Sequence, residues 1–510
     1  MIMEPATMNE TPKKANPLFP FMGIGSLIYA FFYTFFLYKN SSGITYPFFV
    51  GGTCLFFFLY LKKSGITAKK FSIYITVSMI LLGISTCMTD SWILILFNKL
   101  GLFCLFFYMT LHSLYEDKNW NMSKYISSAI NITFSSLLYI FKPFEDIMLF
   151  YKNKRLKEEK PQGKGKYVLF GILIALPLLL VILLLLGSAD AVFGSFIDKI
   201  FSFEIDLGDH FFGISFLYLF AFFASYSIMS RLSVHDLKEE IPDKRTAEPV
   251  IGITFTGMIS IVYLIFCFIQ IVYLFGGWGT LPDGYTYASY AREGFFQLVF
   301  VCLLNLVLVL TCMKRFRENK LLKGILTFIS LCTYIMIASS VYRMILYIQV
   351  YYLTFLRIFV LWALSVIFLL MTGALIMIYK ENFPLVRYCL IIVTSFYLVF
   401  SFSHPDYWIA RYNLSHSMTA EEMQKSRNDN TYYSFETFKD YGYLSRLSMD
   451  AAPVMFKMAD ELGYDSGDFS YWIDDYAVKI LYKNNSSARC FNFSRWKAYN
   501  TYLQKEAGNF

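Results

Sequence analysis

Five charged residues lie at the ends of apolar runs, where charged side chains are uncommon and can bind ions or anionic groups. They are two acids and three arginines, namely Asp190, Arg292, Glu293, Arg343 and Arg357. A charge near the hydrocarbon core of a membrane is costly, so such residues usually pair with one another or face water. If the five meet, one positive charge is left over, which favours binding of an anionic solute or lipid headgroup. The alternative is that the acids only neutralise the arginines and tie neighbouring helices together, with Arg357 reaching towards the interface.

Uncharged polar residues inside apolar runs have a simpler interpretation. Asn305, Gln270 and Gln297 lie where an amide side chain usually forms hydrogen bonds between membrane helices rather than binding a ligand. Asn305 is therefore predicted to support the charged cluster. A second use is open to Asp190, because Ser188 or Asp190 could be the N-cap of a short helix at the membrane interface.

No motif of a known enzyme class is present in the sequence. There is no phosphate-binding P-loop, no GxSxG nucleophile motif, no HExxH zinc motif and no GxGxxG motif after a strand. His404, Asp406 and His416 do not have the spacing of a metal site, and neutral loop histidines are the expected role. Adjacent acids such as Asp474 and Asp475 point to different faces of a helix. The sequence therefore favours a protein without catalytic activity, cofactor or metal ion.

The composition places these residues in a membrane protein. Hydrophobic residues make up 56% of the 510 residues and charged residues only 16%, with a mean hydropathy of +0.48, which is more apolar surface than a soluble protein of this length can bury. The net charge of +8 comes from Lys and Arg clusters between apolar runs, a pattern that orients membrane helices and argues against a nucleic-acid partner. The nine cysteines have no CxxC or metal-binding spacing, and only Cys490 lies in a polar region, so no disulfide is predicted.

Eleven stretches are long and apolar enough to cross a bilayer as helices, because a span needs about 20 mostly apolar residues. The predicted fold class is therefore an all-α polytopic transmembrane helical bundle, followed by a small helical domain. The predicted spans lie near residues 20–38, 44–61, 71–89, 92–111, 167–187, 210–229, 250–275, 294–313, 324–347, 357–379 and 387–403.

The distribution of Lys and Arg predicts how the chain is threaded. Residues 122–151 have apolar side chains at helical spacing on one face and polar side chains on another, which is typical of a helix lying in the interface. If this stretch does not cross the membrane, the Lys and Arg clusters fall on one side throughout. The N-terminus is then cytoplasmic, and residues 404–510 are extracytoplasmic.

The chain is expected to have four regions with different roles. In the last of them, Thr419 and Glu422 are predicted to form a capping box. Ser494 is predicted to be the N-cap of a final helix. The regions are an N-terminal four-span unit at 1–121, an interfacial helix with a basic cytoplasmic linker at 122–166, a seven-span unit at 167–403 and a helical extracytoplasmic domain at 404–510.

Several stretches between residues 165 and 510 resemble a family of bacterial polytopic membrane proteins known as domain of unknown function 4173, which has a relative numbered 4153. Where that family usually has Tyr-Gly-Leu-Thr, this chain has Tyr-Tyr-Leu-Thr at 351–354. The resemblance implies a multi-pass protein of the bacterial cell (inner) membrane, and it implies no reaction. The stretches are "GSADAVFGSF" at 187–196, "YASYAREGFFQLVFVCLLNL" at 287–306, "RMILYIQVYYLTFLRIFVLW" at 343–362, "HPDYWIARYNL" at 404–414 and "DYGYLSRLSMDAAPVM" at 440–455.

Two functions of different classes are compatible with these observations. In the first, the protein is a non-enzymatic membrane protein for transport or lipid handling, and the charged cluster binds an anionic solute or lipid headgroup. In the second, it is an envelope sensor or assembly partner, and residues 404–510 bind another envelope protein.

Overall fold

The computed structural model describes most of the chain, and the described part is helical. Within it, the one pairing of extended backbone is an isolated bridge between Ala247 and Phe316. The predicted all-α fold is confirmed. The described residues are 16–157, 210–237, 245–275, 295–380, 382–417, 441–463, 471–483 and 488–508, with single positions between 179 and 193.

Ten of the described helices are long and apolar enough to cross a membrane. In hydrocarbon every backbone polar group must be bonded within the protein, and a continuous helix satisfies this requirement. The eleventh predicted span, 167–187, lies outside the described residues apart from scattered positions. The ten helices are α1 (Phe19–Leu37), α2 (Thr45–Lys63), α3 (Phe71–Met88), α4 (Trp92–Leu114), α9 (His210–Leu232), α10 (Pro249–Ile269), α12 (Phe295–Arg315), α13 (Lys320–Tyr351), α14 (Phe355–Tyr379) and α15 (Leu385–Phe402).

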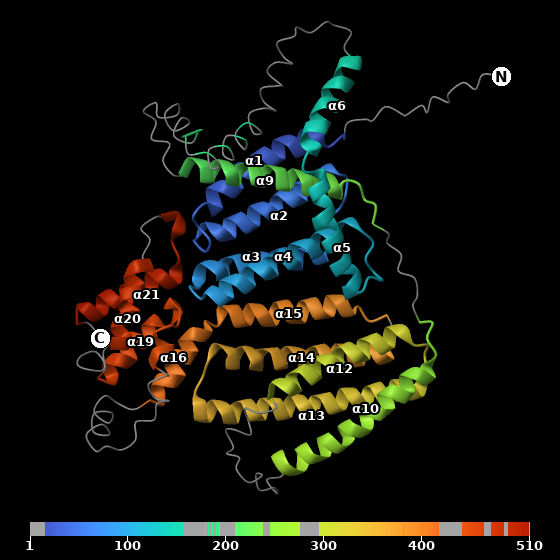
Figure 1. Cartoon of the computed structure of the whole chain (residues 1–510), viewed down its shortest axis with the longest axis vertical. Coiled ribbons are helices and arrows are strands. Elements are labelled where there is room, and N and C mark those ends of the chain that lie inside the picture. The colour runs from blue at the N-terminus through green and yellow to red at the C-terminus, as the bar shows by residue number, and fades with distance from the viewer. Residues whose placement is uncertain are drawn as a thin grey trace, which may run out of the picture.

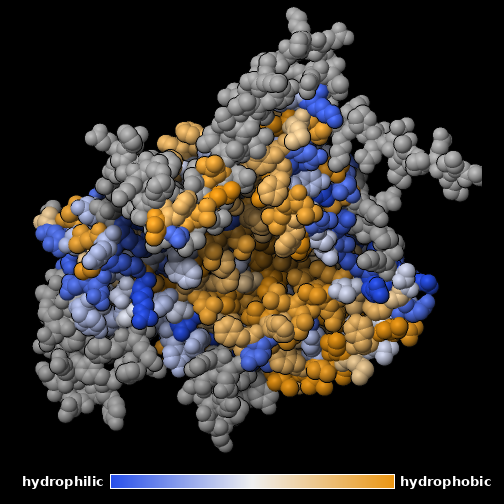
Figure 2. All heavy atoms as spheres, turned by 45° about the horizontal axis from the view of Figure 1, so that its top comes forward, coloured by the Kyte–Doolittle hydropathy of each residue, from blue (hydrophilic) through white to orange (hydrophobic). Residues whose placement is uncertain are grey.

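The long helices lie side by side, from α1 and α9 at one edge to α13 and α10 at the other (Figure 1). Helices α3, α4 and α15 meet in the middle through a buried polar cluster around Asn98. Tyr397 Oη donates to Asn98 Oδ1 at 2.7 Å, and Ser401 Oγ donates to the same oxygen at 2.9 Å. Apolar side chains form a broad belt over the bundle, and polar side chains gather at its two ends (Figure 2). This surface is the one that a lipid bilayer requires.

Helix α5 (Met122–Ser136) runs across the ends of the long helices (Figure 1), and α6 (Lys142–Lys157) follows it after the short helix η1 (Leu137–Tyr139). Tyr125 and Ile132 of α5 are buried against the bundle, whereas Ile126, Ile130 and Phe134 are exposed. A helix with an exposed apolar face at the end of a membrane bundle fits the interface rather than a crossing.

The C-terminal helices pack together at one end of the bundle, and we call them the cap (Figure 1). Their core includes Phe456, Trp472 and Tyr476, all fully buried or nearly so. The prediction that Ser494 caps the last helix is wrong, because Asn492 Oδ1 accepts from Arg495 N. The predicted capping box at residues 419 and 422 lies outside the described residues. The cap consists of α16 (Pro405–Ser415), η3 (Met449–Ala451), α19 (Ala452–Glu461), α20 (Tyr471–Lys483), η4 (Ala488–Cys490) and α21 (Phe493–Glu506).

The two ends of the bundle differ in chemistry. At the cap end, the loops after α1, α3 and α13 contact the cap: Ile44 N donates to Phe491 O at 2.7 Å, and Asn413 Oδ1 accepts from Leu353 N at 2.8 Å. The end of the bundle opposite the cap, which we call the far end, holds most of the basic clusters between described helices. The threading predicted from Lys and Arg would place this end in the cytoplasm, and it stays a prediction. The basic residues at the far end are Lys62, Lys63, Lys69, Lys70, Arg231, Arg315, Arg317, Lys320 and Lys380.

Candidate functional site

The structure describes three of the five residues in the predicted charged cluster. Arg292 and Glu293 lie outside the described residues. Asp190 is exposed, and its Oδ1 accepts a hydrogen bond from Phe193 N at 2.7 Å. This is the hydrogen bond that an N-cap residue makes. No ion pair of Asp190 with a described arginine is present.

Arg343 is buried within the bundle, with only 6% of its surface exposed. Its Nη2 donates to Gln270 Oε1 at 3.2 Å, and Ser339 Oγ donates to the same oxygen at 2.6 Å. Gln270 lies where α10 changes into the π-helical turn η2 (Gln270–Phe275). Single π-helical turns are rare and are frequently found at functional sites.

Arg357 opens α14 close to the cap. Its Nη1 donates to the carbonyl oxygens of Tyr351 and Tyr352, and its Cζ lies 4.3 Å from the centre of the Tyr347 ring. Among the described residues its polar partners are these two carbonyls, and no carboxylate pairs with it. Carbonyl and ring contacts leave the net charge in place, so this guanidinium can still attract an anion.

Tyr352 occupies a backbone position that suits glycine. Its φ is +59° and its ψ is −175°, a region that residues with a side chain rarely adopt. The turn after α13 therefore has a tyrosine at a position where glycine would be unstrained. The carbonyl of this strained residue is one of the two that bind Arg357.

The predicted polar residues divide into a buried and an exposed class. Tyr263 Oη donates to Asn305 Oδ1 at 2.6 Å, and Asn305 Nδ2 donates to Thr333 Oγ1 at 2.9 Å. Asn305 thus links α10, α12 and α13, as a residue that joins helices does. Gln297 was expected to do the same, but it lies on the exposed face of α12.

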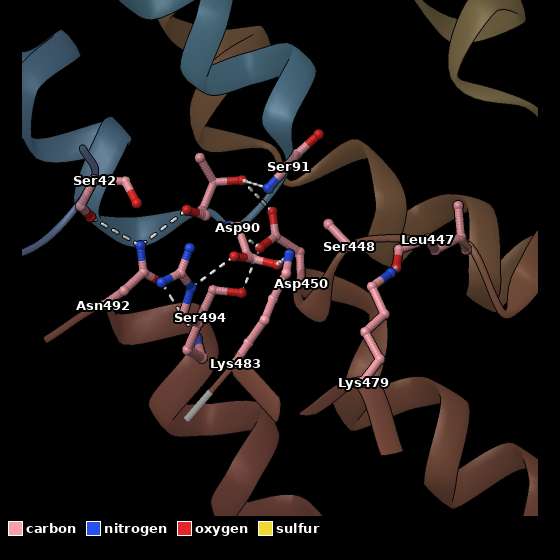
Figure 3. Close-up of polar contacts among 12 residues, drawn as sticks. Ser42, Asp90, Ser91, Leu447, Ser448, Asp450, Lys479, Lys483, Asn492 and Ser494 are labelled. Carbon is pink, nitrogen blue, oxygen red and sulfur yellow. Dashed lines mark hydrogen bonds and ion pairs between the residues drawn. The ribbon is translucent and has the colours of Figure 1, made fainter. Parts of the chain in front are cut away.

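Sequence reasoning missed a buried carboxylate that joins the cap to the bundle, Asp450 in η3 (Figure 3). Its oxygens accept from Thr89 Oγ1 at 2.5 Å, from Asp90 N at 2.9 Å and from Ser494 Oγ. His404 Nδ1 lies 3.1 Å from the carboxylate. One side chain therefore holds the α3–α4 loop, the start of α16 and the start of α21 together.

Asp90 lies beside Asp450 and has charged partners from the cap (Figure 3). Arg495 Nε lies 2.7 Å from its Oδ1, and Lys483 Nζ lies 3.0 Å from its Oδ2. Asn492 Nδ2 adds hydrogen bonds to the carbonyl oxygens of Ser42 and Thr89, both at 3.0 Å. In the sequence, a lone acid in the short loop between two predicted spans marks Asp90 as a candidate for an ion pair, but it does not indicate the partner.

The pKa values of two buried carboxyl groups in the cap are shifted in opposite directions. Burial alone would raise the pKa of Asp450, but hydrogen bonds from His404, Ser494 and Thr89 outweigh it and hold the pKa below the usual value. For Asp406, burial dominates and raises the pKa, although its Oδ2 accepts from Ser448 N at 3.2 Å. Protonation of Asp450 at low pH therefore weakens cap docking, whereas protonation of Asp406 does not.

The described residues hold no group of three or more His, Cys, Asp or Glu side chains that could bind a metal ion. The contacts of Asp90 and Asp450, which we call the junction, join the cap to the bundle and have a structural role. Arg357, at the cap end of α14, is the described residue of the predicted cluster that can most readily attract an anion.

Comparison with known protein families identifies the family of the chain. The model of the family described as Domain of unknown function (DUF4153) matches residues 76–458. The chain belongs to this family. The sequence had been expected to match the family numbered 4173, with 4153 as its relative, and the match is to 4153. The match also begins within α3, well before residue 165, so the DUF4153 region includes both Asp90 and Asp450.

Beyond the DUF4153 match, no curated protein and no solved structure matches the chain. With the ten apolar helices, the family assignment establishes a multi-pass membrane protein.

Proposed function

We propose that this DUF4153 protein is a non-catalytic protein of the cell membrane that binds an anionic solute or lipid headgroup at the cap end of α13 and α14. The observation that supports this proposal is the environment of Arg357. Its guanidinium is oriented by two carbonyl oxygens and the Tyr347 ring, and it has no carboxylate partner among the described residues.

The chemistry of the site suits a phosphate or carboxylate group. A guanidinium has five N–H donors in a planar fork, and it binds such anions with charge-assisted hydrogen bonds. Arg343, whose Nη2 donates to Gln270 Oε1 at 3.2 Å, lies near the same end of the bundle. If the cap faces the outside, as the distribution of Lys and Arg predicts, the anion arrives from the outer leaflet or the extracytoplasmic medium.

The test compares the wild type with Arg357→Gln. Melting temperatures of the purified full chain are measured with added inorganic phosphate in detergent, and in nanodiscs of phosphatidylglycerol or phosphatidylcholine. A ligand that binds only the folded state raises the melting temperature, so the wild type is expected to respond to one anion and the variant is not. Stabilisation by phosphate indicates a solute, and stabilisation by phosphatidylglycerol alone indicates a lipid.

Arg411→Gln is the matched control, because Arg411 is an exposed arginine of the cap that stacks on Trp408. It should respond as the wild type does. Equal responses of the wild type and Arg357→Gln would refute the proposal.

A second function, binding of an envelope protein by the cap, is favoured by one face of α20. Tyr471, Val478, Leu481 and Tyr482 are exposed there, and Tyr482 is 88% exposed. Aromatic side chains of this kind are enriched in protein interfaces. A photo-crosslinking residue at position 482 should give one discrete protein adduct in cells, whereas the same residue at Lys457 should give none.

A further inference from the structure

An apolar groove runs along α1, between this helix and helices α6 and α9. Its volume is about 1080 Å³, slightly above the roughly 300–1,000 Å³ of small-molecule pockets. The walls are almost entirely apolar. Representative lining residues are Ile24, Leu27, Phe31, Ile147, Leu219 and Phe222.

The groove is about as long as the hydrocarbon core of a membrane is thick. Its lining includes Phe19, the first residue of α1, and Tyr38, the residue after its end. Nineteen helical residues rise about 28 Å, which is close to the roughly 30 Å of a hydrocarbon core. Two of the polar groups in the walls are bonded internally, since Thr34 Oγ1 donates to Ala30 O and Tyr218 Oη to Leu27 O. The walls therefore suit hydrocarbon chains.

Arg489 of the cap closes the groove at the cap end. Its Nη1 donates to Phe35 O at 2.8 Å and its Nη2 to Tyr38 O at 3.1 Å, so it binds terminal carbonyls of α1. These bonds engage two of its five donors, and no carboxylate of the described residues pairs with it. A positive charge at the mouth of an apolar groove is complementary to an anionic headgroup above acyl chains.

We infer that an anionic phospholipid occupies this groove, with its acyl chains along α1 and α9 and its headgroup on Arg489. The site is separate from Arg357, which lies on α14. A phospholipid headgroup supplies the negative charge that no described carboxylate gives to Arg489.

The test uses the full chain in phosphatidylcholine vesicles that contain a small fraction of phosphatidylglycerol with a diazirine in its acyl chain. After illumination, labelled peptides are identified by mass spectrometry. Labelling is expected to concentrate on α1 and α9 relative to α10, which is also lipid-exposed. Arg489→Gln should lower the labelling of α1 and α9 about tenfold, because charge-assisted bonds contribute at least about 1.4 kcal/mol. Arg411→Gln and Arg357→Gln should leave it unchanged.

A second variant covers the case in which Arg489→Gln fails to fold. Ser215 lines the groove, and Ser215→Phe should exclude labelled phosphatidylglycerol and labelled phosphatidylcholine from α1 while the melting temperature is retained. Three outcomes would overturn the inference: equal labelling of all lipid-facing helices, no preference for phosphatidylglycerol over phosphatidylcholine, or crosslinks from the groove to residues 167–187 in place of lipid.

Discussion

Asp450 is the residue on which docking of the cap depends most directly. Its carboxylate accepts hydrogen bonds from Thr89, Asp90 and Ser494 and contacts His404. A buried donor left without a partner costs about 1–3 kcal/mol. Asp450→Ala is therefore expected to lower the melting temperature of the purified protein by several degrees, whereas Asp460→Ala, at an exposed position of α19, should have little effect.

The lowered pKa of Asp450 also predicts how stability depends on pH. A carboxyl group whose pKa is lower in the folded state stabilises the protein above its unfolded pKa of about 3.9, and this contribution is lost as the pH falls through the folded value. The wild type should lose stability below about pH 4 more steeply than Asp450→Asn. Parallel curves for the two proteins would mean that this carboxylate does not dock the cap.

Tyr352 stores strain that glycine would relieve. A residue with a side chain in such a region of backbone space costs about 1–3 kcal/mol, and the φ of Tyr352 is +59°. Tyr352→Gly is expected to raise the melting temperature. Tyr351→Gly is the control, because Tyr351 is helical and glycine in a helix costs about 1 kcal/mol. A lower melting temperature for Tyr352→Gly would show that contacts of the tyrosine ring outweigh the strain.

Single residues were predictable where the signal was local. Asn305 interrupts an apolar run, so a hydrogen bond between helices followed from its position, and the structure shows two. Asp450 and Asp90 are separated by 360 residues, and nothing in their spacing indicates that they meet. The prediction for Gln297 failed for a different reason, because the sequence does not show which face of α12 packs against its neighbours.

At the scale of elements, the length of each apolar stretch in the sequence predicted where the helices lie, but it predicted their first and last residues less well. The span predicted at 324–347 is α13, which runs from Lys320 to Tyr351. The helix starts earlier because Asn319 caps it, its Oδ1 accepting from Leu321 N at 2.8 Å. Hydropathy alone does not show where this helix begins. The N-cap residue Asn319, which precedes the apolar run, does indicate it.

The π-helical turn that follows α10 holds an acceptor for two groups of α13. Replacing Gln270 by Leu removes the oxygen that binds Ser339 Oγ and Arg343 Nη2. Because one of these groups is charged and buried, the variant should lose about 1–3 kcal/mol of unfolding free energy. Stability is measured by denaturation of detergent-solubilised protein. Gln297→Leu makes the same chemical change on the exposed face of α12 and should be neutral, and equal losses in both variants would contradict the assigned role.

At the scale of the whole molecule, the cap end and the basic far end predict an orientation. The positive-inside rule places the far end in the cytoplasm and the cap outside. Cys490, in η4 of the cap, is partly exposed. A membrane-impermeant maleimide should label it in intact cells whose outer wall admits the reagent, and Cys490→Ser should abolish the signal. Labelling only after lysis would reverse the orientation.

The cap and the bundle form one cooperative structure only if the contacts between them carry energy. Asp90 and Arg495 are 405 residues apart in sequence, and their side chains are 2.7 Å apart across the junction. Residues in one ion-pair network show coupling energies of about 0.5–3 kcal/mol. Asp90→Asn, Arg495→Gln and the double variant should therefore give non-additive losses of stability in this range.

The surface pair Lys457–Glu461 within α19 provides the reference for this cycle. Both side chains are largely exposed, with 3.8 Å between Lys457 Nζ and Glu461 Oε1, and exposed pairs of this spacing contribute about 0.3–0.5 kcal/mol. A larger coupling for Asp90 and Arg495 than for this pair means that the cap stabilises the membrane helices beneath it. Additive losses across the junction would mean that the cap docks without stabilising them, and partner binding by the cap would then not be transmitted to the bundle through this ion pair.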